Sequence, residues 1–84
     1  MGTRHEKTFR RILMGEGDAN ISFDDTCALL RELGFSERIR GGHYIYAKAG
    51  VLEIVNLQPK GTKTKPYQVR QVRAVILKYR LRLQ

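Results

Sequence analysis

The sequence predicts an α+β fold in which helices cover one face of a three-stranded antiparallel sheet. Three observations support this prediction. Apolar residues recur at helical spacing near both ends of the chain, residues 43–48 alternate as in a strand, and glycines mark turns between short β-branched runs. The expected order of elements is α-α-β-β-β-α.

The first helix is expected in residues 6–15, "EKTFRRILMG", where Phe9, Ile12 and Leu13 share one face. Gly15 and Gly17 end it, and residues 16–20 should form a loop.

The second helix shows the clearest start and stop signals. Ser22 is a good N-cap with Asp25 three residues later, and Gly34 is expected to end the helix. Its buried stripe is formed by Phe23, Cys27, Leu30 and Leu33. The helix dipole favours negative charge in the first turn, which accounts for Asp24 and Asp25. These two acids are therefore not interpreted as a metal site or a catalytic pair.

Three short strands should follow, in residues 35–40, 43–48 and 51–58. Gly41-Gly42 is a strong hairpin signal, and Ala49-Gly50 marks the next turn. Alternation places His43, Ile45 and Ala47 on one face of the middle strand and Tyr44, Tyr46 and Lys48 on the other. Both faces carry apolar residues, so the buried face stays open at this point.

A basic loop and a final helix complete the chain. Residues 59–66, "PKGTKTKP", are expected to be either a solvated loop or one that contacts phosphates. The helix should begin near Pro66 or Tyr67. Its buried stripe is predicted at Val69, Val72, Ile76, Tyr79 and Leu83, with Arg70, Arg73 and Arg80 along one edge and Lys78 and Arg82 nearer the back. One interpretation is that this basic edge contacts a phosphate backbone. The other is that the arginine stems pack over the rim of the core while their charged ends stay in water.

Without the first helix the order is α-β-β-β-α, the layout of the double-stranded-RNA-binding fold. Other small α+β folds share this order. The sequence therefore divides into an N-terminal extension, residues 1–21, and a core domain, residues 22–84.

The charge distribution indicates a polyanionic partner. The net charge is +8, and residues 1–42 are neutral, with seven Lys/Arg against seven Asp/Glu. Residues 43–84 hold nine Lys/Arg against one acid, so the whole excess lies in this half. Nucleic acid is the commonest such partner, and a merely basic surface is the alternative.

The sequence also indicates in which cellular compartment the protein is expected. No apolar run approaches the ~20 residues that span a bilayer, and the N-terminus lacks the apolar region of a signal peptide. Cys27 is the single cysteine, so no intrachain disulfide is possible, as is typical of the reducing cytoplasm. We expect a cytoplasmic protein with no membrane partner.

Residues 22–82 resemble the HicA family, the toxins of bacterial HicAB toxin–antitoxin systems. The matching parts are, in order, "LLRELGF", "ERIR", a Gly-x-His turn, an aliphatic strand, a basic loop with proline, and "VRQVRAVIL". The resemblance implies a double-stranded-RNA-binding-like fold and a ribonuclease that degrades messenger RNA. It also implies a HicB-like antitoxin that covers the histidine and the RNA surface, with His43 at the catalytic position.

The sequence departs from the family pattern in two ways. Gly42 stands where the family usually has serine, and the segment 1–21 precedes the family core. Neither departure removes the histidine. A reduced activity is expected if the serine hydroxyl normally orients the histidine or a phosphate.

RNA cleavage by transesterification needs little from a protein, because the 2′-hydroxyl of the RNA is the nucleophile. A base must take its proton, the leaving oxygen must gain one, and charge must be stabilised. Imidazole exchanges protons near neutral pH, so His43 is the candidate base. No metal-ligand spacing is present, and we expect metal-independent cleavage without a cofactor. The candidates for the general acid are His5, Tyr44 and Tyr46, each a poor one. The RNA-binding candidates are Arg40, Gly41, Gly42, Lys48, Lys60, Lys63, Lys65, Arg70 and Arg73.

Two other functions remain open from the sequence. One is a non-catalytic RNA-binding module of the same fold, in which His43 only packs at the turn. The other is a protein-interaction domain whose basic face meets an acidic antitoxin or adaptor.

Overall fold

A computed structural model describes residues 3–84. Its elements follow one another in this order: α1 (Arg4–Met14), the 3-10 helix η1 (Asp18–Asn20), α2 (Phe23–Glu32), β1 (Ser36–Arg40), β2 (His43–Ala47), β3 (Val55–Leu57), β4 (Pro59–Lys60), β5 (Lys63–Thr64) and α3 (Pro66–Tyr79). The α+β class and the three-stranded antiparallel sheet, in the order β1-β2-β3, are confirmed.

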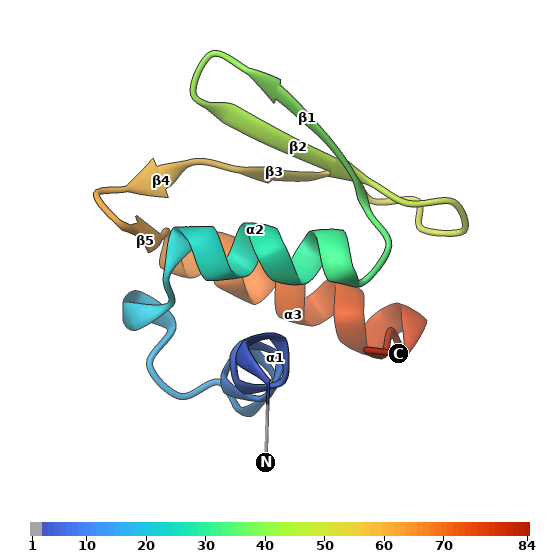
Figure 1. Cartoon of the computed structure of the whole chain (residues 1–84), viewed down its shortest axis with the longest axis horizontal. Coiled ribbons are helices and arrows are strands. Elements are labelled where there is room, and N and C mark those ends of the chain that lie inside the picture. Colours follow the sequence, from blue (N-terminus) through green and yellow to red (C-terminus); the bar gives the residue numbers. More distant parts are fainter. Residues whose placement is uncertain (1–2) are drawn as a thin grey trace.

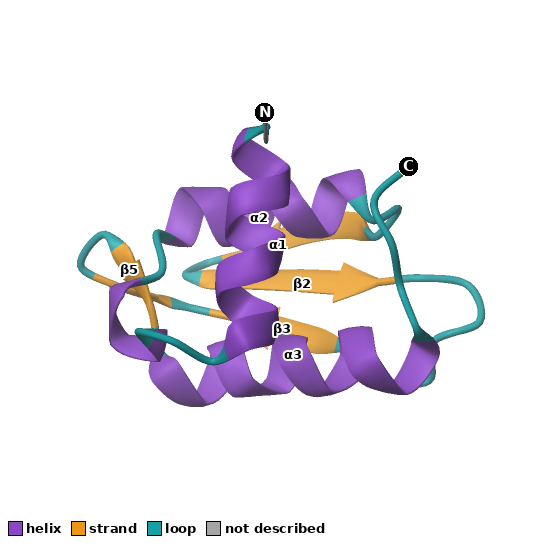
Figure 2. Cartoon of the chain, turned by 90° about the horizontal axis from the view of Figure 1, so that it is seen from below, coloured by secondary structure: helices purple, strands orange, loops and turns teal. Residues whose placement is uncertain are grey.

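The helices all lie on one side of the sheet (Figure 1). Seen from below, α2 and α3 run along the sheet toward its two edges, and α1 crosses both of them (Figure 2). The core lies between these layers. It includes Ile12 of α1, Leu29 of α2, Tyr46, Val55 and Leu57 of the sheet, and Val72 of α3. Because Ile12 is fully buried in this cluster, α1 shares the core of the rest of the chain.

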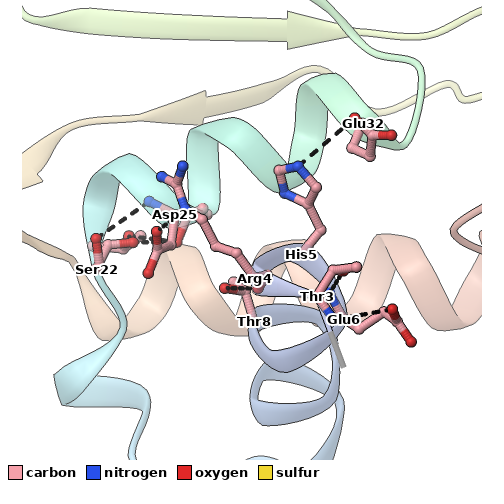
Figure 3. A network of polar contacts seen from close by, with 10 residues as sticks. Thr3, Arg4, His5, Glu6, Thr8, Ser22, Asp25 and Glu32 are labelled. Atoms are coloured by element: carbon pink, nitrogen blue, oxygen red, sulfur yellow. Dashed lines mark hydrogen bonds and ion pairs between the residues drawn. The ribbon is translucent and has the colours of Figure 1, made fainter. Parts of the chain in front are cut away.

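Local sequence signals set the helix ends. Thr3 and Glu6 form a capping box at the start of α1, and Gly15 ends the helix with a positive φ of 70°. Ser22 caps α2 by accepting a hydrogen bond from the Asp25 N–H, as predicted. Figure 3 shows two polar contacts that join α1 to α2: Arg4 Nε lies 2.6 Å from Asp25 Oδ1, and His5 Nε2 lies 3.8 Å from Glu32 Oε2.

Several elements differ from the sequence prediction, and α1 begins at Arg4 instead of at residue 6. Residues 18–20, expected as loop, form η1, and the loop of residues 59–66 contains the β4–β5 hairpin. The third strand is confined to Val55–Leu57, because residues 51–54 are held by α3 instead of by a strand: Tyr79 Oη accepts from the Leu52 N–H and donates to Glu53. Helix α3 ends at Tyr79, since Arg80 adopts a left-handed conformation with φ 52°, and Leu83 lies beyond it.

None of the helices in the described part of the chain is long and apolar enough to cross a bilayer.

Candidate active site on the open face of the sheet

His43 is the first residue of β2 and faces away from the helices. This orientation follows from the positions of the two tyrosines in the same strand. Tyr46 is fully buried, and Tyr44 packs edge-on against Phe23 of α2, with ring centroids 4.9 Å apart. Strand alternation therefore places His43 and Ile45 on the open face. The buried face of the sheet is thus the tyrosine face.

Both ring nitrogens of His43 have a partner. Nδ1 lies 3.2 Å from Asn56 Oδ1, and Nε2 lies 3.3 Å from the Gln58 side-chain nitrogen. Gln58 Oε1 in turn accepts a hydrogen bond from Lys65 Nζ at 3.2 Å. These side chains form a continuous chain, Asn56–His43–Gln58–Lys65, which we call the histidine chain.

The histidine chain has a fixed direction. A lysine ammonium can only donate, so the Gln58 oxygen must face Lys65 and the Gln58 amide nitrogen must face His43. The Nε2 atom then accepts and holds no proton, while Nδ1–H donates to Asn56. This arrangement places the Nε2 electron pair toward the Gln58 amide, as in the tautomer with the proton on Nδ1. That is the form that a general base requires.

The β4–β5 hairpin delivers Lys65 to this place. Lys65 directly follows β5, and the chain is anchored there because the Gln58 N–H donates to Gln68 Oε1 of α3 at 3.0 Å. Gln68 is 3% exposed, so this anchor is part of the core. Lys60 and Lys63 are opposite one another in the hairpin and exposed. The basic loop predicted from the sequence therefore contains a separate two-stranded hairpin, and Lys65 after it reaches the histidine chain.

The open face also carries two arginines from β1. Arg40 is paired in register with His43, and Arg38 with Ile45, so both belong to the face of the histidine. Both are exposed, and neither forms an ion pair within residues 3–84. Glu37, the acid that directly precedes Arg38, points to the other face, where it accepts from Tyr46 Oη at 2.6 Å and pairs with Arg31. Arg38 was missed in the sequence analysis, although its i, i+2 spacing to Arg40 is the signal that could have found it.

Three predicted RNA-binding residues do not join this group. Lys48 follows the opposite end of β2, where its ammonium lies over Gly34 at the end of α2. Arg73 of α3 binds the segment before α2. Its guanidinium donates to both carboxylate oxygens of Asp18 at 2.7 Å, and its Nε–H donates to the Ile12 carbonyl at 2.8 Å. Arg70 is exposed on α3 and has no side-chain hydrogen bond to the histidine chain.

The candidates for a general acid also lie elsewhere. His5 contacts Glu32 at the α1–α2 joint, and the Tyr44 ring lies on the inner face. The Tyr46 hydroxyl is bonded to Glu37, and burial above all, together with hydrogen bonding to Cys27 and Glu37, raises its pKa far above the usual value. Cys27 is a core residue as predicted, and burial raises the pKa of its thiol.

The turn before His43 has open space around it. A Cβ atom on Gly42 would meet no heavy atom within 4 Å, and Gly42 has no positive φ, whereas Gly41 has φ 58°. We therefore expect Gly42→Ser to change the free energy of unfolding by less than about 0.5 kcal/mol. Gly41→Ala should cost about 1 kcal/mol, because a left-handed backbone disfavours a Cβ. Urea unfolding of the two variants checks this, and equal losses would contradict the assigned turn geometry.

No group of three His, Cys, Asp or Glu residues within 3–84 is placed to hold a metal ion. Comparison of the chain with protein-family models, with curated proteins and with solved structures finds no match.

Proposed function

We propose that the protein is a metal-independent endoribonuclease that cleaves messenger RNA with His43 as the general base. In this proposal it is a cytoplasmic toxin with a double-stranded-RNA-binding-like fold, neutralised by a HicB-like antitoxin, as its resemblance to the HicA family implies. The observation that supports the activity best is the direction of the histidine chain. It keeps an electron pair on an exposed imidazole nitrogen, with an ammonium group one side chain away.

The chemistry follows from these groups. The 2′-hydroxyl replaces the Gln58 amide at Nε2, whose contact of 3.3 Å is long for a hydrogen bond. Nε2 takes the proton, the 2′-oxygen bonds to phosphorus, and the bond to the 5′-oxygen breaks. Lys65 and Arg40 stabilise charge on the phosphoryl oxygens. No carboxylate within residues 3–84 hydrogen-bonds to the histidine chain, so we assign protonation of the leaving oxygen to water and expect slow turnover.

The products test this proposal. Purified protein incubated with messenger RNA in EDTA should give fragments with a 2′,3′-cyclic phosphate and a 5′-hydroxyl. End labelling and mass spectrometry identify these ends. Fragments with 5′-phosphates, or cleavage that requires Mg²⁺, would refute the mechanism.

Gln58 is a positioning residue in this scheme, and Gln58→Glu tests that role. A carboxylate at this position accepts a hydrogen bond from Nε2–H and so favours the imidazolium, which cannot act as a base. We expect the cleavage rate at neutral pH to fall about tenfold and the acidic limb of the pH–rate profile to move to higher pH. Gln58→Leu should lower the rate without moving the limb in that direction. An unchanged profile in Gln58→Glu would show that Gln58 does not act on the histidine.

A non-catalytic RNA-binding module is the second candidate. The unpaired Arg38 and Arg40 on an open sheet face favour it, since they can contact phosphates whether or not His43 reacts. In that case the protein would retain RNA without producing fragments.

A further inference from the structure

An apolar groove is lined by α1, by the C-terminal part of α3 and by the residues that follow this helix. Its volume is about 700 Å³. Phe9 and Leu13 of α1 line one wall, and Ile76, Leu81 and Leu83 line the other. Two further apolar residues at this groove are largely exposed: Met14 at 62% and Leu77 at 60%. Large apolar side chains left in contact with water around a concavity mark a binding surface.

The charged residues that line this groove are mostly basic. Arg10, Arg80 and Arg82 line it, and none of them forms an ion pair within residues 3–84. The one acid among the lining residues is Glu6, whose carboxylate accepts the Thr3 N–H in the capping box of α1. An occupant therefore needs both an apolar face and carboxylates beside it.

We propose that this groove binds an acidic amphipathic segment of a partner protein. The apolar lining would receive the apolar stripe of a helix, and the arginines would pair with its flanking Asp or Glu residues. A second copy of this chain is disfavoured, because its own groove would bring three more arginines to the contact. A membrane surface is disfavoured because the groove is concave.

The groove is separate from the histidine chain. In Figure 1 the sheet lies on the far side of α2 and α3 from α1. His43 faces away from the helices, since Tyr44 of the same strand packs against α2. A partner in the groove therefore leaves the open face accessible. This proposal does not rest on the ribonuclease activity and can fail or succeed without it.

Binding of a defined probe tests the groove. The probe is a fluorescein-labelled helical peptide of about 14 residues with Leu at i, i+3, i+4 and i+7 and Glu at the flanking positions. Fluorescence anisotropy should show saturable binding to the full chain. Both Leu77→Gln and the double variant Arg10→Glu/Arg82→Glu should weaken it at least about tenfold. The matched control is Arg38→Glu/Arg40→Glu, which changes the net charge equally on the open sheet face and should leave the affinity within about twofold.

Each contrary result overturns the proposal. Absence of saturable binding, equal binding of a peptide with Lys in place of Glu, or equal weakening by the sheet-face control would each show that the groove does not select acidic segments. Sedimentation with phosphatidylglycerol vesicles that only the groove variants abolish would make it a lipid-binding surface instead. RNA cleavage by the groove variants should equal that of the wild type, which separates this test from that of the ribonuclease.

Discussion

His43→Ala should lower the rate of RNA cleavage by a factor of about 10² to 10⁴, the usual contribution of a general base. The side chain is exposed on the open face, so its removal leaves the core intact, and RNA affinity should stay within about twofold. Single-turnover cleavage of a labelled messenger RNA, together with a filter-binding titration, measures both quantities. In a bacterial host, induced wild type should arrest growth and deplete messenger RNA, whereas His43→Ala should do neither.

His5→Ala is the matched control, because His5 is the only other histidine of the chain. It lies at the joint between α1 and α2 and should retain wild-type cleavage. Equal activity of His43→Ala and the wild type would refute the assignment of the base. If neither the wild type nor His43→Ala arrests growth and RNA stays intact, the non-catalytic binding module is favoured. If both arrest growth, the toxicity does not depend on His43.

Arg73→Ala should lower the free energy of unfolding by about 2–3 kcal/mol. Arg73 and Asp18 are each only 19% exposed, and the guanidinium also bonds the Ile12 carbonyl. Truncation leaves the Asp18 carboxylate and that carbonyl without their partner in a partly buried place, which costs more than the loss of a surface pair. Because one side chain joins α3 to both α1 and η1, the loss should also loosen α1. Urea unfolding followed by circular dichroism measures the change.

Arg70→Ala is the control for this prediction. Arg70 lies on the same helix but is exposed, so its removal should change stability by less than about 0.5 kcal/mol. Similar losses in the two variants would show that the Arg73–Asp18 pair does not stabilise the fold. The comparison also separates two arginines that the sequence analysis grouped along one edge of the last helix.

Much of the fold could be predicted from the sequence because the relevant signals are local. Ser22 and Gly34 mark the ends of α2 through hydrogen bonds and backbone conformations that involve neighbouring residues only. The same holds for Gly15 at the end of α1 and for the turn at Gly41-Gly42. Arg80 gave no such signal, since a non-glycine residue seldom adopts a positive φ, and the end of α3 was placed too late.

The histidine itself could be selected from the sequence, but its surroundings could not. The sequence by itself determined the three helices, the β1–β2 hairpin and the basic C-terminal half, and its resemblance to a known family proposed His43 as the base. Only the tertiary structure decided that His43 lies on the open face beside Gln58 and Lys65, and that Arg73 binds Asp18 and the Ile12 carbonyl. These features depend on strand register and on contacts between residues far apart in the chain. Such contacts are fixed by which side chains the core buries, here the rings of Tyr44 and Tyr46, and not by the order of neighbouring residues.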